Sequence, residues 1–326
     1  MAKVHAMWQN YPEIETELAQ SLALIEDNIH TKNQAVTDAI LEMISAGGKL
    51  LRPAYCLLFS QFNAVDRQKM IALAAAVETL HTATLIHDDI VDDSDLRRHQ
   101  ESIQARFGKD VAVYAGDYLF VVCFKLLANY ASDLKSIQFN SQTMDQILDG
   151  ELSQMTTRYN LDLTPEQYLQ QINGKTGQLF ALSCFIGAYE SQKGLKFARQ
   201  AEKIGLNIGL AFQILDDILD YTQTDVDFGK PVLDDMRRGV YSIPLIMALQ
   251  SNRQTLAPYL EKQAAMTDAD VHAVQGIVRQ SGSVEKAQAL AQDYTNRALA
   301  GLAKLPDMPA KTTLQQLTER LLTRKA

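Results

Sequence analysis

An all-α fold, a single helical bundle, is predicted by the placement of glycine and proline, by the period of the apolar residues and by the composition. No proline occurs between Pro53 and Pro165, and only Gly108, Gly116 and Gly150 bring glycine into that stretch. A strand-rich fold would show turn residues about every 8–12 positions. Long helices are therefore expected over this part of the chain.

Apolar residues recur at helical spacing through most of the sequence. In the first such segment, 66–87, the repeat is carried by Ile71, Ala74, Ala75, Leu80, Ala83, Thr84 and Ile86. The same period predicts helices over 109–130, 142–155, 178–189, 196–219 and 240–250. Shorter amphipathic helices are expected over 266–280, 283–303 and 310–323, with breaks at Gly282, Pro306 and Pro309.

The composition is that of a folded chain with a buried core. Of the 326 residues 47% are apolar, which excludes a disordered protein. No Ser/Gly-rich linker or shift in composition divides the sequence, so a single domain over 1–326 is expected.

Charge and cysteine usage restrict the location and the partners. No run of about 18 apolar residues occurs and the first residues are polar, so we expect no membrane span, no secretory leader and a cytoplasmic protein. Cys56, Cys123 and Cys184 stand singly in apolar contexts without zinc-site spacing, which indicates reduced core residues. A net charge of −8 argues against nucleic acid as a partner.

Aspartate is concentrated in two short windows. Each of the segments LIHDDIVDD (85–93) and QILDDILDY (213–221) ends an apolar helical run with Asp-Asp-x-x-Asp. On a helix the first, second and fifth positions crowd one half of the surface, at the end where carboxylates are disfavoured. A solvated face is one explanation of a single cluster. Two clusters favour Mg²⁺ sites, built from Asp88, Asp89, Asp92, Asp216, Asp217 and Asp220.

Basic residues accompany these clusters, several of them beside glycines. Lys49 and Arg52 lie in GGKLLRP (47–53), Arg97 and Arg98 follow the first cluster, Lys175 lies in GKTG (174–177) and Lys230 in FGKP (228–231). Each alone is ordinarily a surface charge. Together with two metal clusters they predict a pocket for two polyanionic groups, because Arg binds phosphate through paired N–H donors and Lys as a point charge.

The ordered motifs of residues 40–250 resemble those of the trans-polyprenyl diphosphate synthases, the family of farnesyl, geranylgeranyl and longer-chain synthases. They are GGKLLRP, HTATLIHDDIVDDSDLRR (81–98), GDYLF (116–120), GKTGQLF (174–180), FQILDDILDY (212–221), FGKP and GVYSIPL (239–245). The resemblance implies an isoprenoid synthase fold, a homodimer, and a central active-site cavity with the two Asp clusters facing across it.

The resemblance also implies roles for single residues. Three Mg²⁺ ions would bridge Asp88, Asp92 and Asp216 to the diphosphate of an allylic substrate, aided by Arg97, Lys175 and Lys230. Isopentenyl diphosphate would bind to Lys49, Arg52, His81 and Arg98. Thr176 and Gln213 would help to hold the allylic cation or diphosphate. For Asp89, Asp93, Asp95, Asp217 and Asp220, direct and water-mediated metal contacts both stay open.

Two departures from the family pattern affect these assignments. The family usually has Gly-x-Pro-Thr after the paired arginines, whereas this chain has His99, Gln100, Glu101 and Ser102. Val240 stands where the family often has a lysine that contacts the allylic diphosphate. We expect a different loop backbone at the first position and, at the second, weaker allylic binding or compensation by Lys230.

Product length is expected to depend on the helix before Asp88. In the family, an aromatic residue five positions before the first Asp stops chain growth early, and Ala83 occupies that position here, followed by Thr84. One and two turns earlier lie Leu80, Thr79, Ala76, Ala75 and Ala72, and the next helix offers Phe120 and Phe124 as floors. We expect a hexaprenyl to octaprenyl product, with geranylgeranyl as the alternative. Small residues that merely permit close helix packing would explain the same alanines.

Three other functions share features with a long-chain synthase. A class I terpene cyclase would share the fold and the metal chemistry but would not need Lys49, Arg52, His81 and Arg98. A non-catalytic subunit of a heteromeric synthase would be expected to lose its Asp clusters. A catalytic subunit that requires a partner, as in a heteromeric heptaprenyl synthase, is compatible with the sequence.

Overall fold

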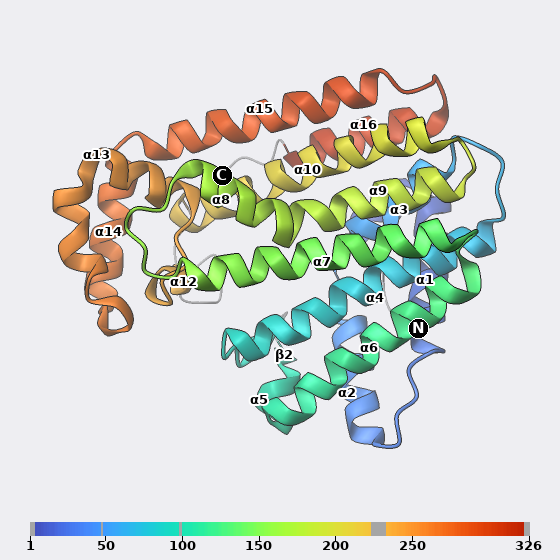
Figure 1. Ribbon diagram of the computed structural model, residues 1–326, viewed down its shortest axis with the longest axis horizontal. Helices are drawn as coiled ribbons and strands as arrows, with labels where there is room; N and C mark the ends of the chain where they lie inside the picture. Colours follow the sequence, from blue (N-terminus) through green and yellow to red (C-terminus); the bar gives the residue numbers. More distant parts are fainter. Residues whose placement is uncertain (1–3, 47, 98–99, 223–232, 323–326) are drawn as a thin grey trace. The chain divides into compact units, whose positions relative to one another are not determined.

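The computed structural model describes residues 4–46, 48–97, 100–222 and 233–322. These residues are almost entirely helical, so the predicted fold class is confirmed (Figure 1). The first elements are η1 Ala6–Asn10, α1 Pro12–Glu26, α2 Gln34–Ser45, α3 Leu51–Ser60, α4 Arg67–Val91, β1 Leu96–Arg97, β2 Gln100–Glu101, α5 Ile103–Phe107, α6 Lys109–Tyr130 and α7 Leu134–Thr156. They are followed by α8 Pro165–Ile172, η2 Asn173–Gly177, α9 Gln178–Glu190, α10 Leu195–Thr222, α12 Asp234–Arg237, α13 Ile243–Leu260, η3 Gln263–Ala265, α14 Asp268–Gln280, α15 Ser283–Ala303 and α16 Pro309–Leu322.

Two helices extend well beyond their predicted bounds. The helix predicted over 142–155 begins at Leu134, because Phe139 anchors a polar stretch by packing edge-on against Phe185 at 4.5 Å. One aromatic residue among polar neighbours produces no detectable apolar period. The helix predicted over 240–250 is α13, which continues to Leu260 through a kink at Asn252 and contains Pro258.

The chain divides into two compact units, unit 1 (1–141, 182–202 and 308–310) and unit 2 (142–181, 203–307 and 311–326). In unit 1, α4 is the central helix, packed against α1, α3 and α6 (Figure 1). Its alanines, among them Ala72, Ala75 and Ala76, are buried, and small side chains allow these neighbours to approach closely. Helix α4 therefore forms the core of unit 1 and carries the first Asp cluster at its C-terminal end.

Helices α4 and α6 are long and apolar enough to cross a membrane by length and composition. In α4, 78% of the apolar window is buried inside the protein, as is typical of a core helix. The corresponding share of α6 is 44%, and Val113, Val121 and Phe124 of this helix are exposed.

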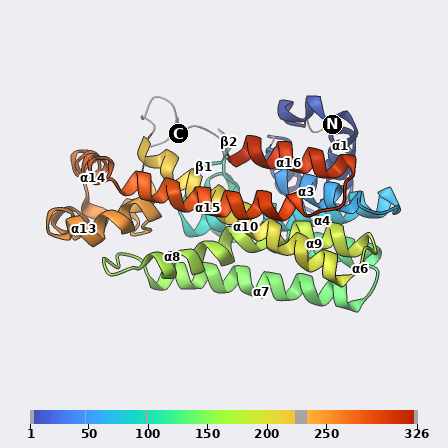
Figure 2. The ribbon, with the colours of Figure 1, turned by 90° about the horizontal axis from the view of Figure 1, so that it is seen from above.

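Unit 2 is built from the second part of α7, from α8 and η2, from the second part of α10, and from the C-terminal helices. Helix α13 packs against α14 and α15, and the three lie side by side (Figure 2). The C-terminal end of α10 is held by α14, since Arg279 and Gln275 donate hydrogen bonds to the carbonyl of Tyr221. The second Asp cluster lies in this secured end of α10.

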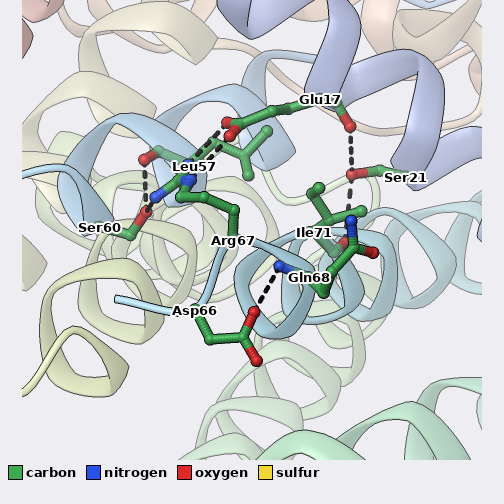
Figure 3. A network of polar contacts seen from close by, with 8 residues as sticks. All are labelled: Glu17, Ser21, Leu57, Ser60, Asp66, Arg67, Gln68 and Ile71. Atoms are coloured by element: carbon green, nitrogen blue, oxygen red, sulfur yellow. Dashed lines mark hydrogen bonds and ion pairs between the residues drawn. The ribbon is translucent and has the colours of Figure 1, made fainter. Parts of the chain in front are cut away.

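A polar network joins three helices of unit 1 at the start of α4 (Figure 3). The Arg67 guanidinium donates from Nε to Glu17 Oε1 at 2.7 Å and from Nη2 to Glu17 Oε2 at 2.6 Å, and its Nη1 donates to Ser60 Oγ at 2.7 Å. Ser60 Oγ in turn donates to the carbonyl of Leu57 at 2.6 Å. A paired Arg–carboxylate contact is among the stronger polar interactions in proteins. It ties α1, α3 and α4 together.

Arg67→Met is expected to lower the free energy of unfolding by about 1–3 kcal/mol, because it leaves the Glu17 carboxylate without its two donors. The urea midpoint of unfolding measures this loss. Arg297→Met provides the control, since its ion pair with Asp293 joins two exposed side chains one turn apart and contributes little. Equal midpoints for the two variants would contradict the proposed importance of the Glu17 contact.

Helices α3 and α9 approach so closely that one position requires glycine. A Cβ added at Gly187 would lie 2.1 Å from the carbonyl oxygen of Cys56, which is far inside van der Waals contact. A Cβ added at Gly276 in α14 would instead have no other atom within 4 Å.

Gly187→Ala is expected to lower the thermal midpoint strongly, since backbone must move to admit the methyl group. Gly276→Ala is expected to raise stability by about 1 kcal/mol, because alanine favours a helix interior over glycine. Differential scanning calorimetry of both variants tests the opposite signs, and shifts in the same direction would refute the close approach.

Candidate functional site

The first Asp cluster lies where it was predicted, at the C-terminal end of α4. Asp88 and Asp89 belong to the last turn, and Asp92 is the C-cap. Their environments differ, because Asp89 is 2% exposed whereas Asp88 and Asp92 are half-buried. Asp89 Oδ1 accepts hydrogen bonds from Arg97 Nε at 2.8 Å and from Arg97 Nη2. Asp89 thus forms a buried ion pair, and Asp88 and Asp92 are the accessible carboxylates of the cluster.

Arg97 is positioned by a small hairpin. Strands β1 and β2 pair antiparallel, with Leu96 opposite Glu101 and Arg97 opposite Gln100. Gln100 and Glu101, two of the residues that replace Gly-x-Pro-Thr, thus form the second strand of this hairpin. Ser102 follows as the N-cap of α5 and accepts from the amide of Ala105. Arg98 and His99 lie outside the described residues.

The residue before the cluster, His87, is enclosed by the GDYLF motif of α6. A Cβ at Gly116 would lie 2.6 Å from the His87 ring, so glycine makes room for the imidazole. Asp117 Oδ1 lies 3.4 Å from His87 Nε2, and the Phe120 ring stacks on the imidazole with centroids 5.4 Å apart. These contacts fix the last turn of α4 against α6. They also explain three positions of a motif whose role the sequence left open.

Two of the predicted isopentenyl diphosphate residues are in contact. Arg52 Nη1 lies 3.0 Å from His81 Nε2, and since a guanidinium only donates, this ring nitrogen is the acceptor. Lys49 is held through its backbone, because the indole of buried Trp8 donates to the Lys49 carbonyl at 2.8 Å. Leu50, which follows, has φ +50° at the N-cap of α3. The N-terminal segment therefore fixes the position of Lys49.

The predicted chain-length residues lie on α4 and α6, two helices in contact within unit 1. Leu80 and Ala83 are buried, and Thr84 is half-buried with its hydroxyl donating to the carbonyl of His81. Phe120 packs on His87, one turn beyond Ala83, and Phe124 is 41% exposed.

The second Asp cluster, in unit 2, again has one buried member. Asp217 is 8% exposed, and both of its oxygens accept hydrogen bonds, Oδ2 from the Tyr168 hydroxyl at 2.5 Å and Oδ1 from Gln213 Nε2 at 2.8 Å. Burial raises the pKa of Asp217 to about 7, although these two hydrogen bonds lower it. Asp216 and Asp220 are half-buried and form the accessible part of this cluster.

A fourth carboxylate, that of Asp235, contributes to the field around the second cluster. Burial raises the pKa of Asp220 to about 7, and the charges of Asp217, Asp235 and Asp216 act in the same direction. So many acidic groups in one place favour either protonation or a bound cation. The sequence interpretation placed no role on Asp235, which lies just beyond the segment 223–232.

Lys175 and Thr176 lie in a π-helical turn, η2, between α8 and α9. The Lys175 ammonium donates to Glu151 Oε2 at 3.1 Å and to Gln154 Oε1 at 3.4 Å. Thr176 Oγ1 donates to Gln213 Oε1 at 2.7 Å. Thr176 and Gln213, both assigned to the allylic substrate, are thus hydrogen-bonded to each other. Lys230 lies outside the described residues.

The donor set suits a hard divalent cation that completes its shell with other oxygens. Among the residues that the structure describes, no three His, Cys, Asp or Glu side chains converge as a preformed metal site. Asp88 and Asp92 in unit 1, and Asp216 and Asp220 in unit 2, are pairs of accessible carboxylates. Mg²⁺ is typically held by one or two carboxylates together with water and substrate phosphate, so each pair fits this ion.

Sequence reasoning missed the residues that position the named ones. Trp8, His87, Glu151 and Tyr168 belong to no charge cluster and contact the site residues from other helices. The sequence offered a signal for Tyr168 alone. It lies seven residues before Lys175, about two helical turns, so the two side chains could share one face of a helix.

Comparisons with known proteins agree with this geometry. The family model described as "Polyprenyl synthetase" matches residues 33–279. Heptaprenyl diphosphate synthase component 2 of Geobacillus stearothermophilus is 33% identical over 92% of this chain and 94% of its own length. A geranylgeranyl pyrophosphate synthase structure from Lactobacillus brevis ATCC 367 has 42% identity and a TM-score of 0.94, covering 98% of this chain and 99% of that one.

A further solved structure carries a metal and a substrate-like ligand. The polyprenyl synthase from Caulobacter crescentus CB15, complexed with calcium and isoprenyl diphosphate, is 32% identical with a TM-score of 0.90, covering 97% of each chain. The matches extend over nearly the whole of the chain and over both of its units. The chain therefore belongs to the polyprenyl synthetase family of prenyltransferases.

Proposed function

We propose that the chain condenses an allylic diphosphate head-to-tail with isopentenyl diphosphate, in a Mg²⁺-dependent reaction that yields a trans-polyprenyl diphosphate of hexaprenyl to octaprenyl length. The main observation in support of this proposal is that the aspartates within each Asp cluster have different roles. In each, the second aspartate is buried in hydrogen bonds while the first and fifth positions stay accessible as a carboxylate pair. Relatives named heptaprenyl diphosphate synthase support the assignment.

By the family resemblance, the accessible carboxylates would hold the allylic diphosphate through metal, and several cations would contact it directly. Mg²⁺, three ions by family resemblance, supplies positive charge that stabilises the departing diphosphate. Asp88, Asp92 and Asp216 are the proposed ligands, with Asp220 beside them. Lys175, Arg97 and Lys230 add fixed positive charge, and preorganised cations of this kind lower the barrier to ionisation.

Isopentenyl diphosphate is held in unit 1 by Lys49, Arg52, His81 and Arg98. The contact between Arg52 and His81 supports this grouping, because it brings two of the four residues together and directs the guanidinium. The double bond of isopentenyl diphosphate attacks C1 of the allylic cation and forms the new carbon–carbon bond. The released diphosphate then takes a proton from C2 of the isopentenyl unit, which restores a double bond. No protein nucleophile is required.

A long product is favoured by the small residue at position 83. Ala83 has no side chain that could block a chain growing along α4, and Leu80, Thr84, Phe120 and Phe124 are the proposed limits. One relative is named for the heptaprenyl product, which lies within the proposed range, and another for the shorter geranylgeranyl product. Geranylgeranyl diphosphate is accordingly the alternative product.

We further propose that the chain acts as one catalytic domain, as a homodimer in the cytoplasm. The name "component 2" of the Geobacillus relative favours a specific alternative, a catalytic subunit that needs a second protein. Both Asp clusters are present here, so the non-catalytic role in such a pair does not fit.

Purified protein incubated alone with Mg²⁺, farnesyl diphosphate and labelled isopentenyl diphosphate is expected to form hexaprenyl to octaprenyl diphosphate. Radio-thin-layer chromatography of the dephosphorylated products measures the length. EDTA is expected to abolish incorporation, and Asp88→Asn to reduce kcat by at least about a hundredfold, since a metal ligand is lost.

The other outcomes of this assay separate the alternatives. Geranylgeranyl as the sole product would overturn the long-chain proposal but leave the reaction class intact. Absence of incorporation by the protein alone, restored by a second subunit, would establish the heteromer. Cyclic hydrocarbon from farnesyl diphosphate alone would indicate a cyclase.

Ala83→Phe is expected to shorten the product by at least one isoprene unit, because the ring would occupy the proposed path beside α4. Product sizing and the thermal midpoint are measured together. Ala300→Phe, the same change at an exposed position of α15, is the control. A loss of stability at position 83 with unchanged product length would mean that the alanine serves only close packing.

A further inference from the structure

A chain of buried hydrogen bonds links three elements of unit 2. It runs from the Tyr168 hydroxyl on α8 to Asp217 Oδ2 at 2.5 Å, from Gln213 Nε2 to Asp217 Oδ1 at 2.8 Å, and from Thr176 Oγ1 to Gln213 Oε1 at 2.7 Å. Tyr168 is 3% exposed and Thr176 is 6% exposed, so water competes little for these bonds. The proposed reaction assigns roles to Thr176 and Gln213 but none to Tyr168.

The order of donors and acceptors makes this chain directional. A carboxylate only accepts, so Gln213 must turn its NH₂ group to Asp217 and its Oε1 to Thr176. The reversed amide would place oxygen against carboxylate oxygen. Thr176 must then donate its single hydroxyl hydrogen to Gln213, and it presents only lone pairs to any other group.

The same chain holds both the π-helical turn and the helix that leads into it. Tyr168 and Thr176 lie on the continuous segment α8–η2, and each is bonded to α10, one through Asp217 and the other through Gln213. Single π turns are uncommon and recur at functional sites. This turn carries Lys175, whose position depends on the turn being held.

The backbone of the turn lies close to that of two neighbouring helices. A Cβ at Gly174 would lie 2.7 Å from Gly150 Cα on α7, and one at Gly209 on α10 would lie 2.9 Å from Gly177 Cα. Two glycine pairs thus seat the turn against α7 and α10. These glycine contacts involve backbone only. The hydrogen-bond chain adds a restraint on the rotation of the side chains that form it.

We infer that Tyr168 is a positioning residue, which through Asp217 and Gln213 fixes the Thr176 hydroxyl and the π turn that carries Lys175. Asp217 acts in this chain as an anchor, since each of its oxygens accepts a hydrogen bond. The inference rests on the proposed function, which places Thr176, Gln213 and Lys175 at the allylic diphosphate.

Tyr168→Phe removes only the hydroxyl and is expected to lower kcat by about tenfold to a hundredfold, the range for a hydrogen bond to a charged group. The KM for isopentenyl diphosphate is expected to stay unchanged, because the hydrogen-bond chain ends at Thr176, which the proposed function assigns to the allylic substrate. Tyr189→Phe is the matched control. It deletes a hydroxyl that donates to the Asp133 carboxylate at 3.0 Å, in unit 1.

Thr176→Val and the double variant complete a cycle. If Tyr168 acts through Thr176, the double variant loses little more kcat than the single variants do. Full additivity, or a Tyr168→Phe enzyme with the kcat of Tyr189→Phe, would overturn the inference.

Hydrogen–deuterium exchange of the peptide spanning 169–180 tests the positioning without substrate. Faster exchange in Tyr168→Phe than in wild type supports it, and unchanged exchange refutes it. An inactive wild-type protein with faster exchange in the variant would reject the proposed reaction and retain the positioning of the turn. The two failures are thereby distinguished.

Discussion

In each Asp cluster three carboxylates are crowded at the C-terminal end of a helix, and the arrangement of the side chains around them depends on this crowding. Like charges one turn apart repel, and the helix dipole opposes them further. The chain meets this constraint in the same way twice. In each Asp-Asp-x-x-Asp motif the second aspartate is buried and bonded, Asp89 to Arg97 and Asp217 to Tyr168 and Gln213. The remaining pair is left accessible and is a natural ligand for Mg²⁺.

The two anchors nevertheless differ in charge, and this difference affects how each cluster is balanced. Arg97 brings a full positive charge to Asp89, whereas Tyr168 and Gln213 are neutral donors that offset none of the charge of Asp217. Asp235 adds to the field of the second cluster, and burial raises the pKa of Asp217 and of Asp220 to about 7. Part of the net charge of −8 is thus a local excess that metal would neutralise.

Most of the fold could be predicted from the sequence, because helical periodicity and sparse glycine and proline are local signals. The start of α7 could not be predicted, since it depends on the distant contact of Phe139 with Phe185. The charged site residues were found because like charges at regular spacing are conspicuous. The sorting of Asp89 from Asp88, and the roles of Trp8 and Tyr168, depend on neighbours brought together by the fold, which no spacing along the chain reveals.

The glycines of the site give a second example of contacts that the sequence alone does not reveal. As sequence, GKTG indicated that backbone approaches a ligand, because its lysine lies beside glycine, whereas GDYLF contributed only to the family resemblance. In the structure Gly116 makes room for the His87 ring, and Gly174 makes room for Gly150. Both glycines thus act through packing. Gly116 lets α6 lie close to the last turn of α4, which carries Asp88, and Gly174 lets the π turn that carries Lys175 lie close to α7. A glycine in these motifs can therefore reflect close packing as well as contact with a ligand. The two explanations are distinguished only when the atoms that face each glycine are known.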